Sequence, residues 1–126
     1  MSRLLLPGII AVTLAGCGSN APDMATVSGA VTFEGQPVEE GEIRLVPQDK
    51  SHATQAGKIR NGAYSFPARI GDNRVEILAS RVDPTRKSEM GPVMLDFIPA
   101  KYNSASSLTA NVTPDGKNTF DFALSK

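Results

Sequence analysis

Hydrophobic and polar residues alternate with a period of two along most of the chain after residue 25. Such runs cover residues 27–33, 43–45, 58–60, 75–79, 108–112 and 120–124. A period of two places alternate side chains on opposite faces of a strand, so each run predicts a strand with one buried and one solvated face. No segment after residue 17 has the 3.6-residue period of an amphipathic helix. The pattern therefore predicts an all-β domain over residues 26–126.

Residues that favour turns separate these runs. Asn61-Gly62 is the strongest hairpin signal, because both residues tolerate the positive φ of a type I′ turn. Gly35 is expected in a turn conformation closed to residues with a Cβ, and Pro37 where no backbone donor is needed. Gly29, inside the first run, either lets another chain approach closely or marks a bulge. About seven antiparallel strands at this spacing predict a Greek-key β-sandwich.

Residues 81–96 do not fit this alternation. Pro84, Gly91 and Pro92 interrupt the segment, and charges of both signs are mixed along it. A connection of this length is unusual in a compact domain. We interpret it as a mobile loop, with a functional loop as the alternative.

The first sixteen residues have the features of an export signal. Arg3 carries the only side-chain charge before Asp23, and residues 4–14 are uncharged and largely aliphatic. Eleven helical residues would span roughly 16 Å, about half of a bilayer core of about 30 Å. The segment therefore predicts a secretory signal peptide rather than a membrane-spanning helix.

This segment ends in Leu14-Ala15-Gly16-Cys17, which resembles the lipobox of bacterial lipoproteins. The resemblance implies cleavage between Gly16 and Cys17, a diacylglyceryl group on the Cys17 thiol and a further acyl chain, such as palmitate, on the new amino group. Two or three chains give stable membrane anchoring. The alternative is a signal peptide cut at another small residue, with Cys17 incidental. Gly18, in place of an aspartate, favours the outer membrane by the same resemblance.

The lipobox divides the chain into a signal peptide (1–16), a lipidated tether (17–25) and a domain (26–126). The tether GSNAPDMA that follows the cysteine is small, polar and interrupted by Pro22. Eight residues of this kind have a random-coil reach of about 15 Å. We therefore expect the domain to lie close to the lipid headgroups.

The domain also resembles a family of small lipoproteins with a carboxypeptidase regulatory-like, transthyretin-like sandwich. Its first hairpin is matched by VSGAVTF (27–33), GQPV (35–38) and GEI (41–43), and later strands by NGAYSF (61–66) and RVEI (74–77). The closing segments 98–103 and 118–122 are similar to lipoprotein members of the group. The resemblance covers residues 26–124 and implies the sandwich fold, while it says almost nothing of activity.

Composition narrows the function. The 13 basic and 13 acidic residues balance, so no nucleic-acid partner is indicated. A single Cys excludes an intramolecular disulfide. The chain has no Trp, and the aromatic residues outside the predicted core are Tyr64, Tyr102 and Phe97. We expect Tyr102 to hydrogen-bond to backbone at a corner of the sandwich, with a ligand-binding aromatic as the alternative.

Candidate catalytic and metal-ligating residues are few. His52 is the only histidine and lies in a polar loop, so a Ser-His-Asp hydrolase is conceivable but has no nucleophile motif beside it. The acidic group at 39–42 has no regular calcium-binding spacing. The basic residues of 81–96 have acidic neighbours, which argues against a headgroup-binding patch. We expect no metal and no cofactor.

These observations predict a non-enzymatic lipoprotein of the cell envelope with a structural or interaction role. Its partners would be the membrane, through the acyl chains on Cys17, and an envelope protein or polysaccharide. The alternative is a carbohydrate- or peptide-binding module of the cell surface. A hydrolase centred on His52 is the third hypothesis, and a carboxylate within hydrogen-bond distance of that ring would favour it.

Overall fold

The computed structural model describes residues 23–49, 52–114 and 116–126. The strands are β1 (Met24–Phe33), β2 (Gln36–Pro37), β3 (Glu40–Pro47), β4 (Gln55–Arg60), β5 (Ala63–Arg69), β6 (Gly71–Leu78), β7 (Ser80–Ser88), β8 (Gly91–Asp96), β9 (Thr109–Val112) and β10 (Phe122–Leu124). A single turn of 3-10 helix, η1 (Ala100–Tyr102), precedes β9. The predicted all-β class is confirmed.

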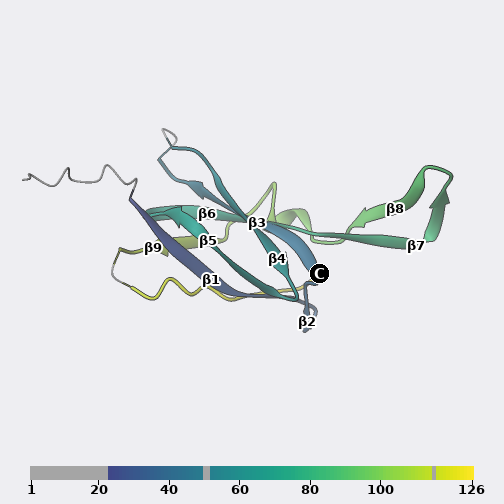
Figure 1. The fold of residues 1–126 in the computed structure, drawn as a ribbon, viewed down its shortest axis with the longest axis horizontal. Coiled ribbons are helices and arrows are strands. Elements are labelled where there is room, and N and C mark those ends of the chain that lie inside the picture. Colours follow the sequence, from purple (N-terminus) through teal and green to yellow (C-terminus); the bar gives the residue numbers. More distant parts are fainter. Residues whose placement is uncertain (1–22, 50–51, 115) are drawn as a thin grey trace, which may run out of the picture.

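Eight of these strands form one curled sheet (Figure 1). Its order is β10-β1-β5-β4-β3-β6-β9, and β2 pairs with β1. The expectation of purely antiparallel pairing is wrong for β10, which runs parallel to β1 with Val31 beside Phe122. The cause is the connection after β9, which follows β1 in the same direction: Ser28 N donates to Asn118 O over 3.0 Å, and Phe120 N donates to Ser28 O over 2.9 Å.

Paired structure begins two residues before residue 26, where the domain was expected to start. Met24 pairs with Arg69 and Ala25 with Ala68. Asp23 O also accepts a 2.8 Å hydrogen bond from Ile70 N. The β1–β5 ladder therefore continues to the end of β5, taking up Met24 and Ala25 from the segment assigned to the tether. Gly16, Cys17 and the rest of 1–22 lie outside the described residues.

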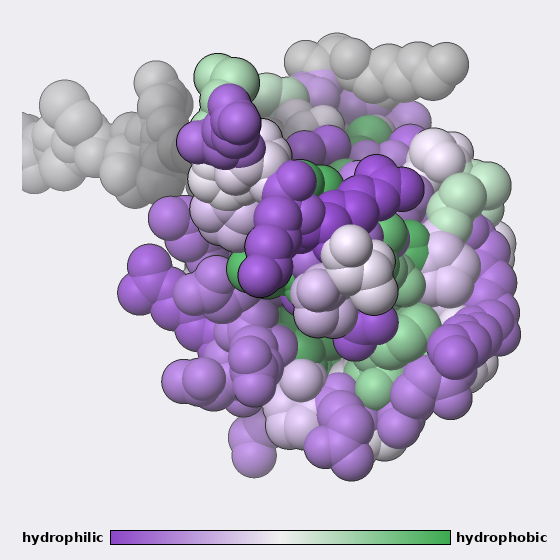
Figure 2. Space-filling view, turned by 90° about the vertical axis from the view of Figure 1, so that its right-hand side faces the viewer, coloured by the Kyte–Doolittle hydropathy of each residue, from purple (hydrophilic) through white to green (hydrophobic). Residues whose placement is uncertain are grey.

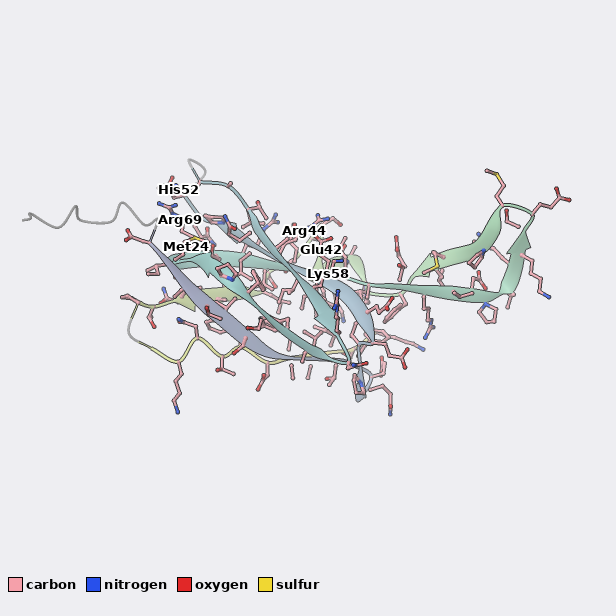
Figure 3. The ribbon with its side chains drawn as sticks, in the orientation of Figure 1. Met24, Glu42, Arg44, His52, Lys58 and Arg69 are labelled. Carbon is pink, nitrogen blue, oxygen red and sulfur yellow. The ribbon has the colours of Figure 1, made fainter. Side chains whose placement is uncertain are left out.

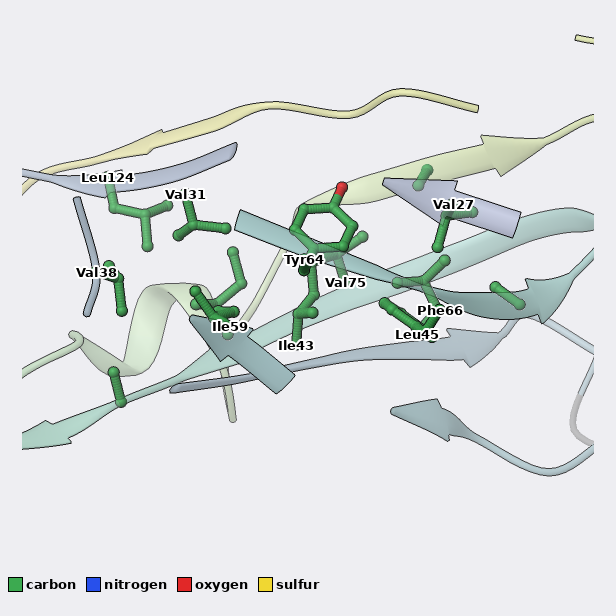
Figure 4. Packing of buried hydrophobic residues seen from close by; sticks show 14 of the residues in the cluster. Val27, Val31, Val38, Ile43, Leu45, Ile59, Tyr64, Phe66, Val75 and Leu124 are labelled. Atoms are coloured by element: carbon green, nitrogen blue, oxygen red, sulfur yellow. The ribbon is translucent and has the colours of Figure 1, made fainter. Parts of the chain in front are cut away.

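The core lies inside the curl of the sheet and is built from the predicted buried faces (Figure 4). Val27, Val31, Ile43, Val75 and Ile77 have no exposed surface. Phe66 is also buried, whereas three other phenylalanines assigned to the core are half-buried and pack against its margin: Phe33, Phe120 and Phe122.

Tight turns join the strands where the sequence placed them. Asn61 and Gly62 have φ of 51° and 76° and connect β4 to β5, with Arg60 paired to Ala63. This is the conformation that a type I′ hairpin needs. Gly35 has φ of 79° between β1 and β2, and Glu34 before it is also left-handed. Pro37 of β2 pairs with Thr32 of β1.

Residues 81–96, which were expected to be a loop, form a β-hairpin. β7 and β8 pair with each other in a separate two-stranded sheet, which we call the arm (residues 80–96), and it projects from one end of the molecule (Figure 1). A register shift lies between Val82 and Lys87. There the Asp83 carboxylate accepts hydrogen bonds from Thr85 N at 2.9 Å and Thr85 Oγ1 at 2.6 Å. This local turn accommodates Pro84 within the strand, which is why the alternation of a strand is lost in the sequence.

Candidate functional site

The arm carries the exposed large hydrophobic side chains of the described residues. They are Met90 (98% exposed), Met94 (55%), Val82 (53%) and Leu95 (41%). Scattered hydrophobic residues are normal on protein surfaces, but these four share one projecting element, which makes the arm a candidate interaction site. Seen from the arm's end of the molecule, hydrophobic patches lie among hydrophilic residues (Figure 2).

A groove of about 1280 Å³ opens between the base of the arm and the β1–β2 turn. We call it the arm groove. Phe33 and Phe97 contribute aromatic surface, and Arg81, Val82 and Met94 line it from the arm. Its other wall is formed by residues 36–40. The exposed apolar surface of the arm therefore continues into a concave site on the body of the domain.

Phe97 links the two sides of the groove. Its ring meets Phe33 edge to face, with centroids 5.5 Å apart and planes at 66°. The Arg81 guanidinium lies 5.0 Å from the Phe97 ring centroid, within the range of a cation–π contact. Phe97 N also donates to Ala79 O over 3.3 Å. Arg81 is thus held at the groove by stacking, while its N–H donors are not engaged in an ion pair with any described residue.

Charges of both signs surround this aromatic pair. Arg60 lies on the same rim as Glu39 and Glu40, and none of them takes part in the ion pairs of the described part of the chain. Glu34 is different, because its carboxylate accepts a 2.6 Å hydrogen bond from Lys126 N and holds the last residue beside the groove. The groove can therefore receive a ligand that combines apolar and charged groups.

Tyr64 was expected among the exposed aromatics, and that expectation is wrong. The side chain is 4% exposed and its hydroxyl donates a hydrogen bond to Phe120 O. Burial raises the pKa of Tyr64, and the Asp121 carboxylate raises it further, so the phenol remains a donor. The alternation of the strand already predicts this burial. Tyr64 is two residues before Phe66 and so lies on the same face of β5, the face that the alternation places in the core.

Gly29 lies directly across from Tyr64 in the β1–β5 ladder. A Cβ at this position would lie 1.9 Å from Phe120 O and 2.9 Å from the Tyr64 hydroxyl. The missing side chain therefore makes room for the hydrogen bond between Tyr64 and Phe120. The VSGAVTF and NGAYSF motifs meet at this point.

Tyr102 lies in η1 and fastens the end of the chain. Its hydroxyl accepts a 3.1 Å hydrogen bond from Ser125 N, and the Lys101 ammonium lies 5.1 Å from its ring centroid. Asn103, next in sequence, donates from its side-chain amide to Ile77 O over 3.2 Å. These contacts tie η1 to β6 and to the C-terminal segment, so Tyr102 acts within the fold rather than at the arm groove.

His52 lies at the end of the molecule away from the arm, as do Met24 and Arg69 (Figure 3). Its Nε2 is 3.4 Å from Asp49 Oδ2, which supplies the carboxylate that the hydrolase hypothesis requires. The two residues are three positions apart on one loop and both side chains reach solvent. A hydrolase also needs a nucleophile and donors for an oxyanion, and the contact between His52 and Asp49 supplies neither.

Within the acidic group at 39–42, Glu42 forms an ion pair with Arg44. The Glu42 carboxylate accepts from the Arg44 guanidinium at 3.1 and 3.2 Å on the outer face of the sheet (Figure 3). Hydrogen bonding to Glu42 raises the pKa of Arg44. No group of three or more His, Cys, Asp or Glu side chains suited to a metal ion occurs in the described residues. In the same part of the chain, no helix has the length and apolar character needed to cross a membrane.

Comparisons with known proteins give little further information. No protein-family profile and no curated protein matches the chain. A crystal structure of a 9R-lipoxygenase from Cyanothece PCC8801 aligns with 82% of this chain at 17% identity and a TM-score of 0.40. The aligned region is 16% of the lipoxygenase chain.

Proposed function

We propose that this chain is a lipid-anchored, non-enzymatic protein of the bacterial cell envelope whose arm and arm groove form an interaction site. The anchor is supported by the sequence Leu14-Ala15-Gly16-Cys17 after a short apolar segment. The interaction site is supported by the exposed hydrophobic residues on the arm and by the groove at its base. The resemblance to lipoproteins with a transthyretin-like sandwich agrees with both parts.

The observation that carries the proposal is the position of the arm relative to the start of β1. Met24 and the arm lie at opposite ends of the long axis of the molecule (Figures 1 and 3). Six residues lie between Cys17 and Met24, so their Cα atoms are at most about 25 Å apart when the chain is fully extended. An anchored chain would hold the Met24 end near the headgroups and present the arm to the compartment, where a protein partner can reach it.

The arm groove favours the peptide form of the alternative function over the carbohydrate form. Sugar rings stack on open aromatic faces, but Arg81 covers one face of Phe97 and Phe33 meets it edge to face. A peptide instead needs apolar contact combined with charged partners, and the groove has both.

Mass spectrometry of the protein extracted from membranes tests the anchor. We expect loss of residues 1–16 and the mass of a diacylglyceryl group on Cys17, with one further acyl chain on the new amino group. The Cys17→Ser variant should lack this mass and leave the membrane fraction. A bare Cys17 thiol on the mature protein, or cleavage at another bond, would refute lipid anchoring.

A further inference from the structure

The arm is a two-stranded sheet, so β7 and β8 each leave one backbone edge unpaired among the described residues, and the β7 edge is the one beside the arm groove. The direction of the β7 edge follows from the hydrogen bonds of β6. Val75 N donates to Leu108 O over 2.8 Å, and Ala79 O accepts from Phe97 N. The backbone N–H and C=O groups of the odd-numbered residues here therefore point toward residues 97–108. Even-numbered residues present theirs to β3, as in the pair of Leu78 with Glu42. Because β7 follows β6 with a single residue between them, Ser80 and Val82 present their N–H and C=O groups to the β3 side.

Strand β3 starts too late to cover this edge. Continuing the register from Glu42 and Leu78 places Glu40 beside Ser80, and Glu40 is the first residue of β3. Beyond it, β7 pairs with no strand on this side among the described residues. The arm groove, with residues 36–40 at one wall and Arg81 and Val82 at the other, therefore occupies the place that one more strand would fill.

We propose that a short extended segment of a partner protein adds to this edge, antiparallel to β7, with an acidic residue next to an apolar one. The side chain of a guest residue opposite Arg81 lies on the same face of the strands as the Arg81 side chain. An acidic side chain there can pair with the Arg81 guanidinium, which lies over Phe97 and forms no ion pair with a described residue. The guest residue opposite Val82 shares the outer face with Val82 and Met94, which pair across the arm. Addition of a strand to a sheet edge is an established mode of peptide recognition.

The structure also limits the length of the guest segment. Past Val82 the edge is interrupted, since Asp83 turns its carboxylate onto Thr85 N and Pro84 has no N–H to donate. A register shift and a proline are features that block unrestricted edge pairing. Because Glu40 lies beside Ser80, the added ladder covers only the positions opposite Arg81 and Val82. The charged and apolar side chains of the guest therefore supply the specificity.

This inference deepens the proposed interaction role, and a peptide titration tests it. The probe is the fluorescein-labelled peptide acetyl-Thr-Val-Glu-Val-Thr-amide, added to the mature chain in detergent micelles. We expect amide chemical-shift changes at residues 80–82 and 38–40. N-methylation of the two valines, which removes strand hydrogen bonds without altering the protein, should weaken binding about tenfold. Replacing the peptide's Glu by Lys should weaken it as well.

A variant of the protein tests the charge contact. Arg81→Glu should reverse the preference between the Glu and Lys peptides, and Arg81→Lys should retain it. Equal binding of the N-methylated peptide, shifts confined to other residues, or no binding at about 1 mM peptide would overturn strand addition. Pairing of the edge with a second copy, seen as concentration-dependent association that the peptide does not reverse, would overturn the partner peptide. None of these outcomes changes the mass of the lipidated N-terminus, so the two proposals fail separately.

Discussion

At the scale of single residues, Gly29, Tyr64 and Phe120 act as one unit. The Tyr64 ring crosses from β5 toward Gly29, and its hydroxyl binds the Phe120 carbonyl on the segment that leads to β10. A donor buried to this extent needs its acceptor, because an unpaired buried hydroxyl costs about 1–3 kcal/mol. The unit therefore joins β1, β5 and residues 116–121, which do not adjoin one another along the chain.

The Gly29→Ala substitution is predicted to lower the free energy of unfolding by about 1–3 kcal/mol. The added Cβ would lie against Phe120 O, which is backbone and moves only with its strand. Urea denaturation followed by circular dichroism measures the change. Gly57→Ala is the matched control, because its Cβ meets the Phe66 ring instead. Phe66→Leu should partly relieve Gly57→Ala and leave Gly29→Ala unrelieved; equal relief of both would contradict the backbone clash.

At the scale of elements, the arm differs from the rest of the fold in how it is held together. Its two strands contact each other and reach the body only near the base, whereas an isolated hairpin is marginally stable in water. The turn around Asp83 is the main polar structure within it. Asp83 is buried, and hydrogen bonds from the Thr85 hydroxyl and backbone lower the pKa of this carboxyl.

The arm is predicted to lose order at acid pH before the curled sheet does. The lowered pKa of Asp83 means that its stabilising effect is complete above the usual value of 3.8 and is lost as pH falls through the lower, folded value. Carboxyl NMR of Asp83 and hydrogen exchange of the arm amides measure this. Thr85→Val removes the hydrogen bond from the Thr85 hydroxyl, which is the larger cause of the lowered pKa, and should return the Asp83 pKa toward 3.8. An Asp83 that titrates at 3.8 or above in the unsubstituted chain would contradict the role of this turn.

The elements also show what the sequence can and cannot predict. The β4–β5 hairpin was predictable because Asn61-Gly62 fixes its turn through local backbone preference alone. The arm was not, because Pro84 and the Asp83 turn break the alternation that identifies a strand. The parallel direction of β10 depends on where residues 116–121 lie in space, which periodicity does not encode. The arm groove was missed for the same reason, since Phe33, Phe97 and Arg81 meet only after the sheet curls.

At the scale of the whole molecule, the two ends of the domain have different character. The end with Met24 and His52 lies where the chain emerges toward the proposed anchor, and the other end carries the arm (Figures 1 and 3). The C-terminus lies between them, tied by Lys126 N to Glu34 and by Lys101 Nζ to Lys126 O. Under the proposed anchoring, the curled sheet would set the distance between the membrane surface and the arm.

This arrangement predicts that the arm lies farther from the bilayer than the start of β1. The chain contains no Trp, so single Trp residues introduced at Asp23 and at Met90 are clean reporters of depth. Both positions are exposed, and neither side chain belongs to the core. In vesicles that hold the lipidated protein, brominated lipids should quench the fluorescence of Asp23→Trp more than that of Met90→Trp. Removal of the lipid with Cys17→Ser should abolish the difference, because a released domain has no fixed orientation. Stronger quenching at Met90 would mean that the arm inserts into lipid, and the exposed methionines and leucine would then serve the membrane rather than a protein partner.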